Sequence, residues 1–75
     1  MTLPKHHSYY WSRDEVWERL PLLKRSALYY LSQGMTVSQT IIRLQDSRPA
    51  ECTRPVFREA VEDLFDSFMA EIGKR

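Results

Sequence analysis

The sequence predicts an all-α fold, a small bundle of three or four helices, on three observations. Apolar residues recur at helical spacing along most of the chain, signals for helix starts and ends occur at regular intervals, and no segment alternates polar and apolar residues as a strand does. The length of 75 residues suits one domain with a thin core. We expect a single helical domain over residues 11–75, preceded by a mobile arm over residues 1–10.

The first predicted helix begins after Ser12. Ser12 and Glu15 have the S-x-x-E spacing of a capping box, and Trp11 stands where it can pack on Val16 as a hydrophobic staple. Pro21 interrupts this helix, because its ring clashes with the carbonyl of the preceding turn. The chain therefore kinks or starts a new helix at Pro21.

The second predicted helix runs from Pro21 to Gln33 and ends at Gly34, a residue type common just after helix ends. Apolar residues lie around most of its circumference: Leu22, Leu23, Ala27, Leu28, Tyr29, Tyr30 and Leu31. Such a helix is usually central in its domain. In a chain this small, the alternative is that part of this surface is exposed to a partner.

Two further helices follow. Thr36 and Gln39 form a second capping box, and Val37, Ile41 and Leu44 then share one face. Residues 46–53 are predicted to form a loop, after which Thr53, Pro55 and Gly73 mark the start and end of a long amphipathic helix. Its apolar face consists of Phe57, Val61, Leu64, Phe65, Phe68 and Ile72, and its opposite face carries Glu59, Glu62, Asp63 and Asp66.

Composition excludes several classes of function. Two glycines are too few for a phosphate-binding glycine loop, and a net charge of +1 does not drive nonspecific binding to nucleic acid. One cysteine allows no intrachain disulfide, which favours a reducing compartment. Neither a signal peptide nor an apolar segment long enough for a membrane is recognisable. We expect a cytoplasmic protein with no membrane partner.

The residues that could carry chemistry are few. His6 and His7 diverge on any regular element, and with Cys52 they do not make a zinc site. Cys52 lies beside Glu51, which disfavours a reactive thiolate. The sequence thus predicts no metal, no cofactor, no small-molecule substrate and no enzymatic activity.

Three groups of residues are candidates for contact with a protein partner. Tyr9, Tyr10, Trp11 and Arg13 combine aromatic and basic groups that can anchor a protein interface, stack on nucleic-acid bases, or simply cover the core. Tyr29 and Tyr30 add aromatic surface. The carboxylates Glu59, Glu62, Asp63 and Asp66 form either a solvated helix face or a surface that docks on basic groups.

The stretch "ALYYLSQGMTVSQTIIRL", residues 27–44, resembles the start of helix-turn-helix domains of the resolvase, transposase and response-regulator kind. The matching positions are Leu31, Gly34, Thr36, Val37, Gln39 and Leu44. The resemblance implies that residues 36–45 form the supporting helix and residues 54–72 the recognition helix. It also implies DNA contacts by Lys5, Arg13, Arg54 and Arg58, with the protein acting as a dimer.

Two departures from that pattern favour a different function. Residues 45–53 contain no glycine and are longer than the usual turn, and the following helix carries carboxylates that phosphates would repel. The sequence therefore predicts first a small regulatory protein that binds and modulates or inhibits a larger protein, such as part of the transcription machinery. DNA binding is the alternative, and a homodimer is compatible with both.

Overall fold

The computed structural model describes residues 10–73, and the predicted all-α bundle is confirmed over this part of the chain. Four α-helices follow one another: α2 (Arg13–Arg19), α3 (Pro21–Ser32), α4 (Val37–Leu44) and α5 (Arg54–Gly73). A short 3-10 turn, η1 (Gln45–Ser47), continues from α4. All but the last residue of the predicted arm, including Lys5, His6, His7 and Tyr9, lies outside the described residues.

The start of α2 is fixed by the predicted capping box of Ser12 and Glu15. The Glu15 carboxylate accepts hydrogen bonds from the Ser12 amide at 2.9 Å and from the Ser12 hydroxyl at 3.3 Å. The hydrogen bond from the Ser12 amide, followed by that from Arg19, lowers the pKa of Glu15. Leu20 leaves helical geometry, and Pro21 then occupies the first turn of α3, where its missing amide costs nothing.

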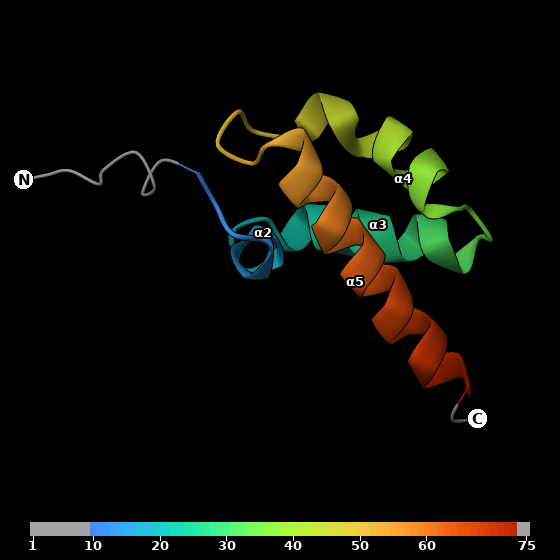
Figure 1. Ribbon diagram of the computed structural model, residues 1–75. Coiled ribbons are helices and arrows are strands. Elements are labelled where there is room, and N and C mark those ends of the chain that lie inside the picture. The colour runs from blue at the N-terminus through green and yellow to red at the C-terminus, as the bar shows by residue number, and fades with distance from the viewer. Residues whose placement is uncertain (1–9, 74–75) are drawn as a thin grey trace, which may run out of the picture.

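The end of α3 is a Schellman turn around Gly34, whose φ is +91°. The Gly34 amide donates to the Leu31 carbonyl, and the Met35 amide donates to the Tyr30 carbonyl. Thr36 and Gln39 then exchange the two hydrogen bonds of the predicted capping box, at 3.0 and 3.1 Å. These contacts reverse the chain sharply between α3 and α4 (Figure 1).

The loop between α4 and α5 is shorter than expected. The predicted loop began at Asp46, but Asp46 and Ser47 lie in η1, because the chain tightens into a 3-10 turn at the end of α4. The remaining loop is tied to the start of α2 by a hydrogen bond from the Trp11 amide to the Glu51 carbonyl, at 3.0 Å. Arg48 also donates to the Cys52 carbonyl at 2.6 Å.

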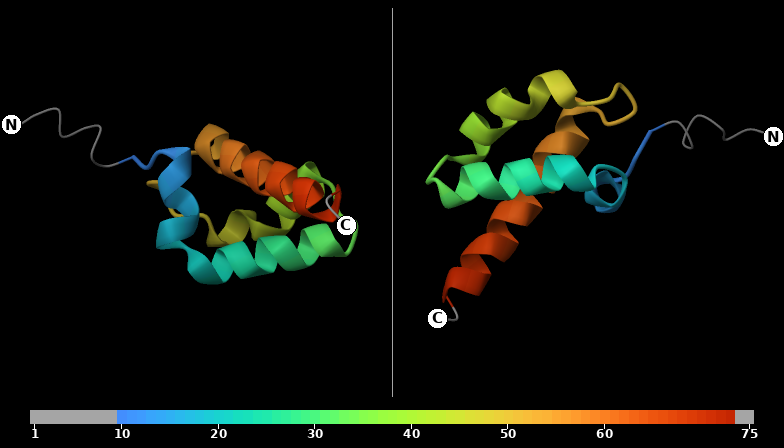
Figure 2. Two further views of the ribbon diagram at one scale, coloured as in Figure 1. Left: turned by 90° about the horizontal axis from the view of Figure 1, so that it is seen from below. Right: turned by 180° about the vertical axis from the view of Figure 1, so that it is seen from behind.

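The helix with the most buried residues is α5, with four, whereas α3, which is apolar on most sides, has two. α5 packs against α2, α3 and α4, as Figures 1 and 2 show from three sides. On α3 only Ala27 and Leu31 are buried, whereas Leu22 is 74% exposed. Leu23, Leu28 and Tyr30 also pack against the core, so the exposed apolar residues of α3 are Leu22 and Tyr29. That this exposed part meets a partner stays a prediction.

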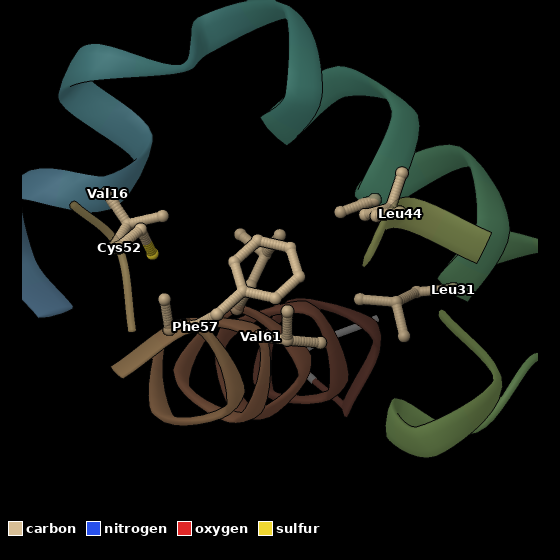
Figure 3. Close-up of a cluster of buried hydrophobic side chains, with 9 residues drawn as sticks. Val16, Leu31, Leu44, Cys52, Phe57 and Val61 are labelled. Carbon is tan, nitrogen blue, oxygen red and sulfur yellow. The ribbon is translucent and has the colours of Figure 1, made fainter. Parts of the chain in front are cut away.

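The core gathers residues from all four helices and from the last loop. Its buried members are Val16, Ala27, Leu31, Leu44, Cys52, Phe57, Ala60, Val61 and Leu64. Figure 3 shows the ring of Phe57 extending from α5 into the middle of this cluster. The Trp17 indole packs on Phe57, with 6.1 Å between ring centroids, and donates to the Ala60 carbonyl at 3.1 Å. This contact fixes α2 on α5.

Thr40 is a polar residue inside this apolar core. Its side chain is fully buried, and its hydroxyl has no hydrogen-bond partner in the described part of the chain. A buried donor that loses its water without gaining a partner destabilises the fold. We therefore expect Thr40→Val, which keeps the shape and removes the hydroxyl, to raise the free energy of unfolding by about 1 kcal/mol, as measured by urea denaturation.

Thr36, the N-cap of the same helix, provides a contrasting substitution. The same substitution there removes the hydroxyl that accepts the Gln39 amide, and Thr36→Val is expected to lower stability by about 1 kcal/mol. Thr36 is the N-cap of α4 and has extended backbone angles, so its substitution tests the lost capping hydrogen bond, whereas Thr40→Val tests the buried hydroxyl inside the helix. Equal effects of the two substitutions would contradict this account of Thr40.

Candidate protein-interaction surfaces

Of the predicted contact residues near the N-terminus, some make contacts within the domain itself. Tyr10 is exposed, but Trp11 is half-buried, packs on the core and carries the Arg19 guanidinium 5.3 Å from its ring centroid. Arg13 forms an ion pair with Asp63 of α5, at 3.4 Å. Trp11 thus covers the core, and Arg13 links α2 to the acidic face of α5.

The two tyrosines of α3 lie at the other end of the bundle. Tyr29 is exposed, Tyr30 is half-buried, and their rings meet edge to face with centroids 5.8 Å apart. The Arg43 guanidinium of α4 stands 6.0 Å from the Tyr30 ring centroid. In Figure 1, α2 and the C-terminal end of α3 are on opposite sides of the molecule. The structure therefore splits the predicted aromatic contacts into two separate places.

The four predicted carboxylates of α5 are all exposed. Glu62 pairs with Arg58 one turn earlier, at 3.2 Å, and Asp63 pairs with Arg13. Exposed pairs of this kind contribute little to stability. Apart from the exposed Arg13–Asp63 pair between α2 and α5, the acidic face faces solvent, and Glu59 and Asp66 carry no ion pair among the described residues.

The C-terminal half of α5 differs from its N-terminal half. The predicted apolar face is buried only as far as Leu64; beyond it Phe65 and Phe68 are half-buried, and Met69 and Ile72 are each 47% exposed. Figures 1 and 2 show the reason, since α5 continues past α3 and away from α4. We name Phe65, Phe68, Met69 and Ile72 the distal face of α5. Phe65 and Phe68 still pack against the core, so the apolar stripe is only partly covered beyond Leu64, and its last residues, Met69 and Ile72, are exposed.

A groove between the end of α4 and the start of α5 was not predicted. It has a volume of about 760 Å³ and is lined by Arg48, Arg54 and Arg58 together with Ile41, Pro55 and Asp46, among others. Arg54 and Arg58 were candidates for DNA contact. Arg48 lies in the loop, where no sequence motif marked it as a candidate contact residue. The other DNA candidate that is described, Arg13, lines a different depression with Trp17 and Asp63.

Cys52 is fully buried in the core, and this burial raises the pKa of its thiol, while the nearby charge of Arg48 acts in the opposite direction. The cause is therefore desolvation and not the adjacent Glu51, as the sequence had suggested. Because the pKa is raised in the folded state, this thiol favours folding at neutral pH and loses that contribution as pH rises through its folded pKa.

We expect Ellman's reagent to leave native Cys52 unmodified at neutral pH, since the sulfur is both protonated and inaccessible. In concentrated urea the reagent should modify one thiol per chain, measured by absorbance of the released thiolate. Immediate reaction of the native protein would show that the loop opens readily. A Cys52→Ala variant provides the baseline for both conditions.

Within residues 10–73, no cluster of three or more histidine, cysteine or acidic side chains is arranged to hold a metal ion. Over the same residues, none of the helices combines the length and the hydropathy that a membrane span requires. The chain matches no known protein family, no curated protein and no solved structure.

Proposed function

We propose that this protein is a small regulator that acts by binding a larger protein, with the distal face of α5 as its main contact. The observation that carries the proposal is the exposure of Met69 and Ile72 on a helix whose apolar residues from Phe57 to Leu64 are buried. Apolar stripes of this kind commonly insert into a groove of a partner protein. The function follows from binding alone and requires no catalytic group.

The charges beside the distal face indicate the chemistry of the partner. Asp66 lies one turn before Met69, and Glu62 lies one turn before Asp66, so carboxylates flank the apolar residues. A complementary partner surface is an apolar groove with lysine or arginine at its rim. A component of the transcription machinery has such basic surfaces where it meets nucleic acid, and occupying one would inhibit it.

Affinity capture from a lysate of the source organism, with quantitative mass spectrometry, tests this proposal. We expect Met69→Ala/Ile72→Ala to lower the recovery of the specific partner by about tenfold or more, because apolar anchors dominate such interfaces. Leu22→Ala is the matched control, since Leu22 is an exposed apolar residue on a different helix. Circular dichroism should show that both variants remain folded.

Two results would contradict the proposal. Equal recovery of every captured protein by the wild type and by Met69→Ala/Ile72→Ala would remove the distal face from partner binding. A loss of the same size with Leu22→Ala would show that the captured proteins recognise exposed apolar groups in general. Only selective loss with the α5 variant supports a specific docking role.

DNA binding is the second candidate function, supported by Arg54 and Arg58 in the first two turns of α5. In helix-turn-helix proteins the N-terminal residues of the recognition helix approach base edges. A gel shift at low salt should then show binding that weakens steeply as salt rises, and Arg54→Ala/Arg58→Ala should weaken it further. Absence of a shift at low salt rejects this candidate.

A further inference from the structure

The groove between α4 and α5 has the composition of a binding site for a peptide that is both acidic and apolar. Its volume of about 760 Å³ is within the usual range for ligand sites. Three guanidinium groups, from Arg48, Arg54 and Arg58, and one carboxylate, from Asp46, line it. The excess of positive charge selects an anionic ligand.

The arginines differ in how firmly they are held. Arg48 is half-buried, and its hydrogen bond to the Cys52 carbonyl positions the guanidinium before any ligand arrives. Arg58 uses its Nε atom to bind Glu62, which leaves its two terminal nitrogens for a ligand. Arg54 is exposed at the first residue of α5. Guanidinium groups bind carboxylates through paired hydrogen bonds, so this set suits more than one carboxylate.

Apolar atoms at the same groove distinguish a peptide from nucleic acid. Ile41 and Pro55 contribute to the lining, and an apolar side chain of a peptide can cover them, whereas the phosphate groups that make most backbone contacts with a protein cannot. The basic surface is also short, because Arg54 and Arg58 are only about 6 Å apart along the helix axis. Glu59 and Glu62 follow immediately on α5 and would repel a longer run of phosphates.

We infer that this groove binds an acidic segment of a partner protein, with an apolar side chain seated between glutamate or aspartate residues. The site lies at the opposite end of α5 from the distal face, so the inference goes beyond the proposed function and does not depend on it. With both surfaces in use, the protein would hold two elements of a larger complex.

Fluorescence anisotropy with a short labelled peptide of glutamates around one central leucine tests this inference. The wild type should bind it, with an affinity that falls as salt rises. Arg54→Gln/Arg58→Gln should weaken binding by about tenfold or more. Arg25→Gln, which removes an exposed arginine of α3 outside the groove, should leave binding unchanged. Replacing the leucine by glycine, or the glutamates by glutamines, should also weaken it.

Three results would overturn the inference. The first is equal binding by the wild type and Arg54→Gln/Arg58→Gln. The second is tighter binding of a labelled DNA duplex than of the peptide, lost in the same variant, which would assign the groove to nucleic acid. The third is dimerisation of the free protein, lost in that variant, which would assign it to the acidic face of a second copy. Retained peptide binding by Met69→Ala/Ile72→Ala would show that this site and the distal face are independent.

Discussion

Replacement of Phe57 by alanine is expected to lower the free energy of unfolding by about 3–5 kcal/mol. The Phe57 side chain is 1% exposed and lies between α5 and the Trp17 indole, in the middle of the core. Truncating a buried phenylalanine costs about 3–5 kcal/mol. A domain of this size has a total stability of about 4–11 kcal/mol, so the loss is a large fraction of the whole. Urea denaturation followed by circular dichroism measures it.

Phe68 is the matched control for Phe57, being the same residue type on the same helix. Since Phe68 is only half-buried, Phe68→Ala should cost about 1 kcal/mol and leave the chain folded. Equal costs for the two substitutions would mean that the distal half of α5 packs as tightly as the proximal half. That outcome would also remove the structural basis for docking through the distal face.

Gly34→Ala is expected to lower the free energy of unfolding by about 1–2 kcal/mol, because Gly34 has a φ of +91°. No atom lies within 4 Å of the position that the added methyl group would occupy. The cost therefore comes from the backbone conformation alone and not from a steric clash. Thermal denaturation and urea denaturation should both show it.

Gly73 is the control for Gly34, since it lies in α5 and an added methyl group would also meet open space. There alanine favours the helix, and Gly73→Ala should raise stability by up to about 1 kcal/mol. The two glycine substitutions are thus expected to change the free energy of unfolding in opposite directions. A neutral or stabilising Gly34→Ala would contradict the description of the Schellman turn.

The boundaries of the helices could be predicted from the sequence because each depends on groups within a few residues. The Ser12–Glu15 and Thr36–Gln39 pairs satisfy amides at their own helix starts, and Pro21 and Gly34 act through their own backbone angles. Only the 3-10 turn at Gln45–Ser47 was missed. Its residues carry no proline, glycine or capping pair that would mark it.

The choice of central helix could not be predicted in the same way. The segment from Pro21 to Gln33, whose apolar residues lie on most sides, was open to two interpretations, a central helix or a partly exposed one. In the structure α5 has four buried residues, whereas α3 has two. Burial depends on where the other helices pack, and composition alone does not contain that information. For the same reason, the pattern that predicted one continuous apolar face on α5 did not reveal that Met69 and Ile72 at its distal end are exposed.

The sequence by itself therefore determined the fold class, the helix boundaries and the two faces of α5, since all of these arise from local hydrogen bonding and helical periodicity. Only the tertiary structure decided which surfaces are available. The loop brings Arg48 beside Arg54 and Arg58, the Arg13–Asp63 pair engages two predicted contact residues with each other, and Trp11 is recruited to the core. Each of these three contacts joins residues from different segments of the chain. They meet because the chain folds back on itself, which the local sequence pattern does not show.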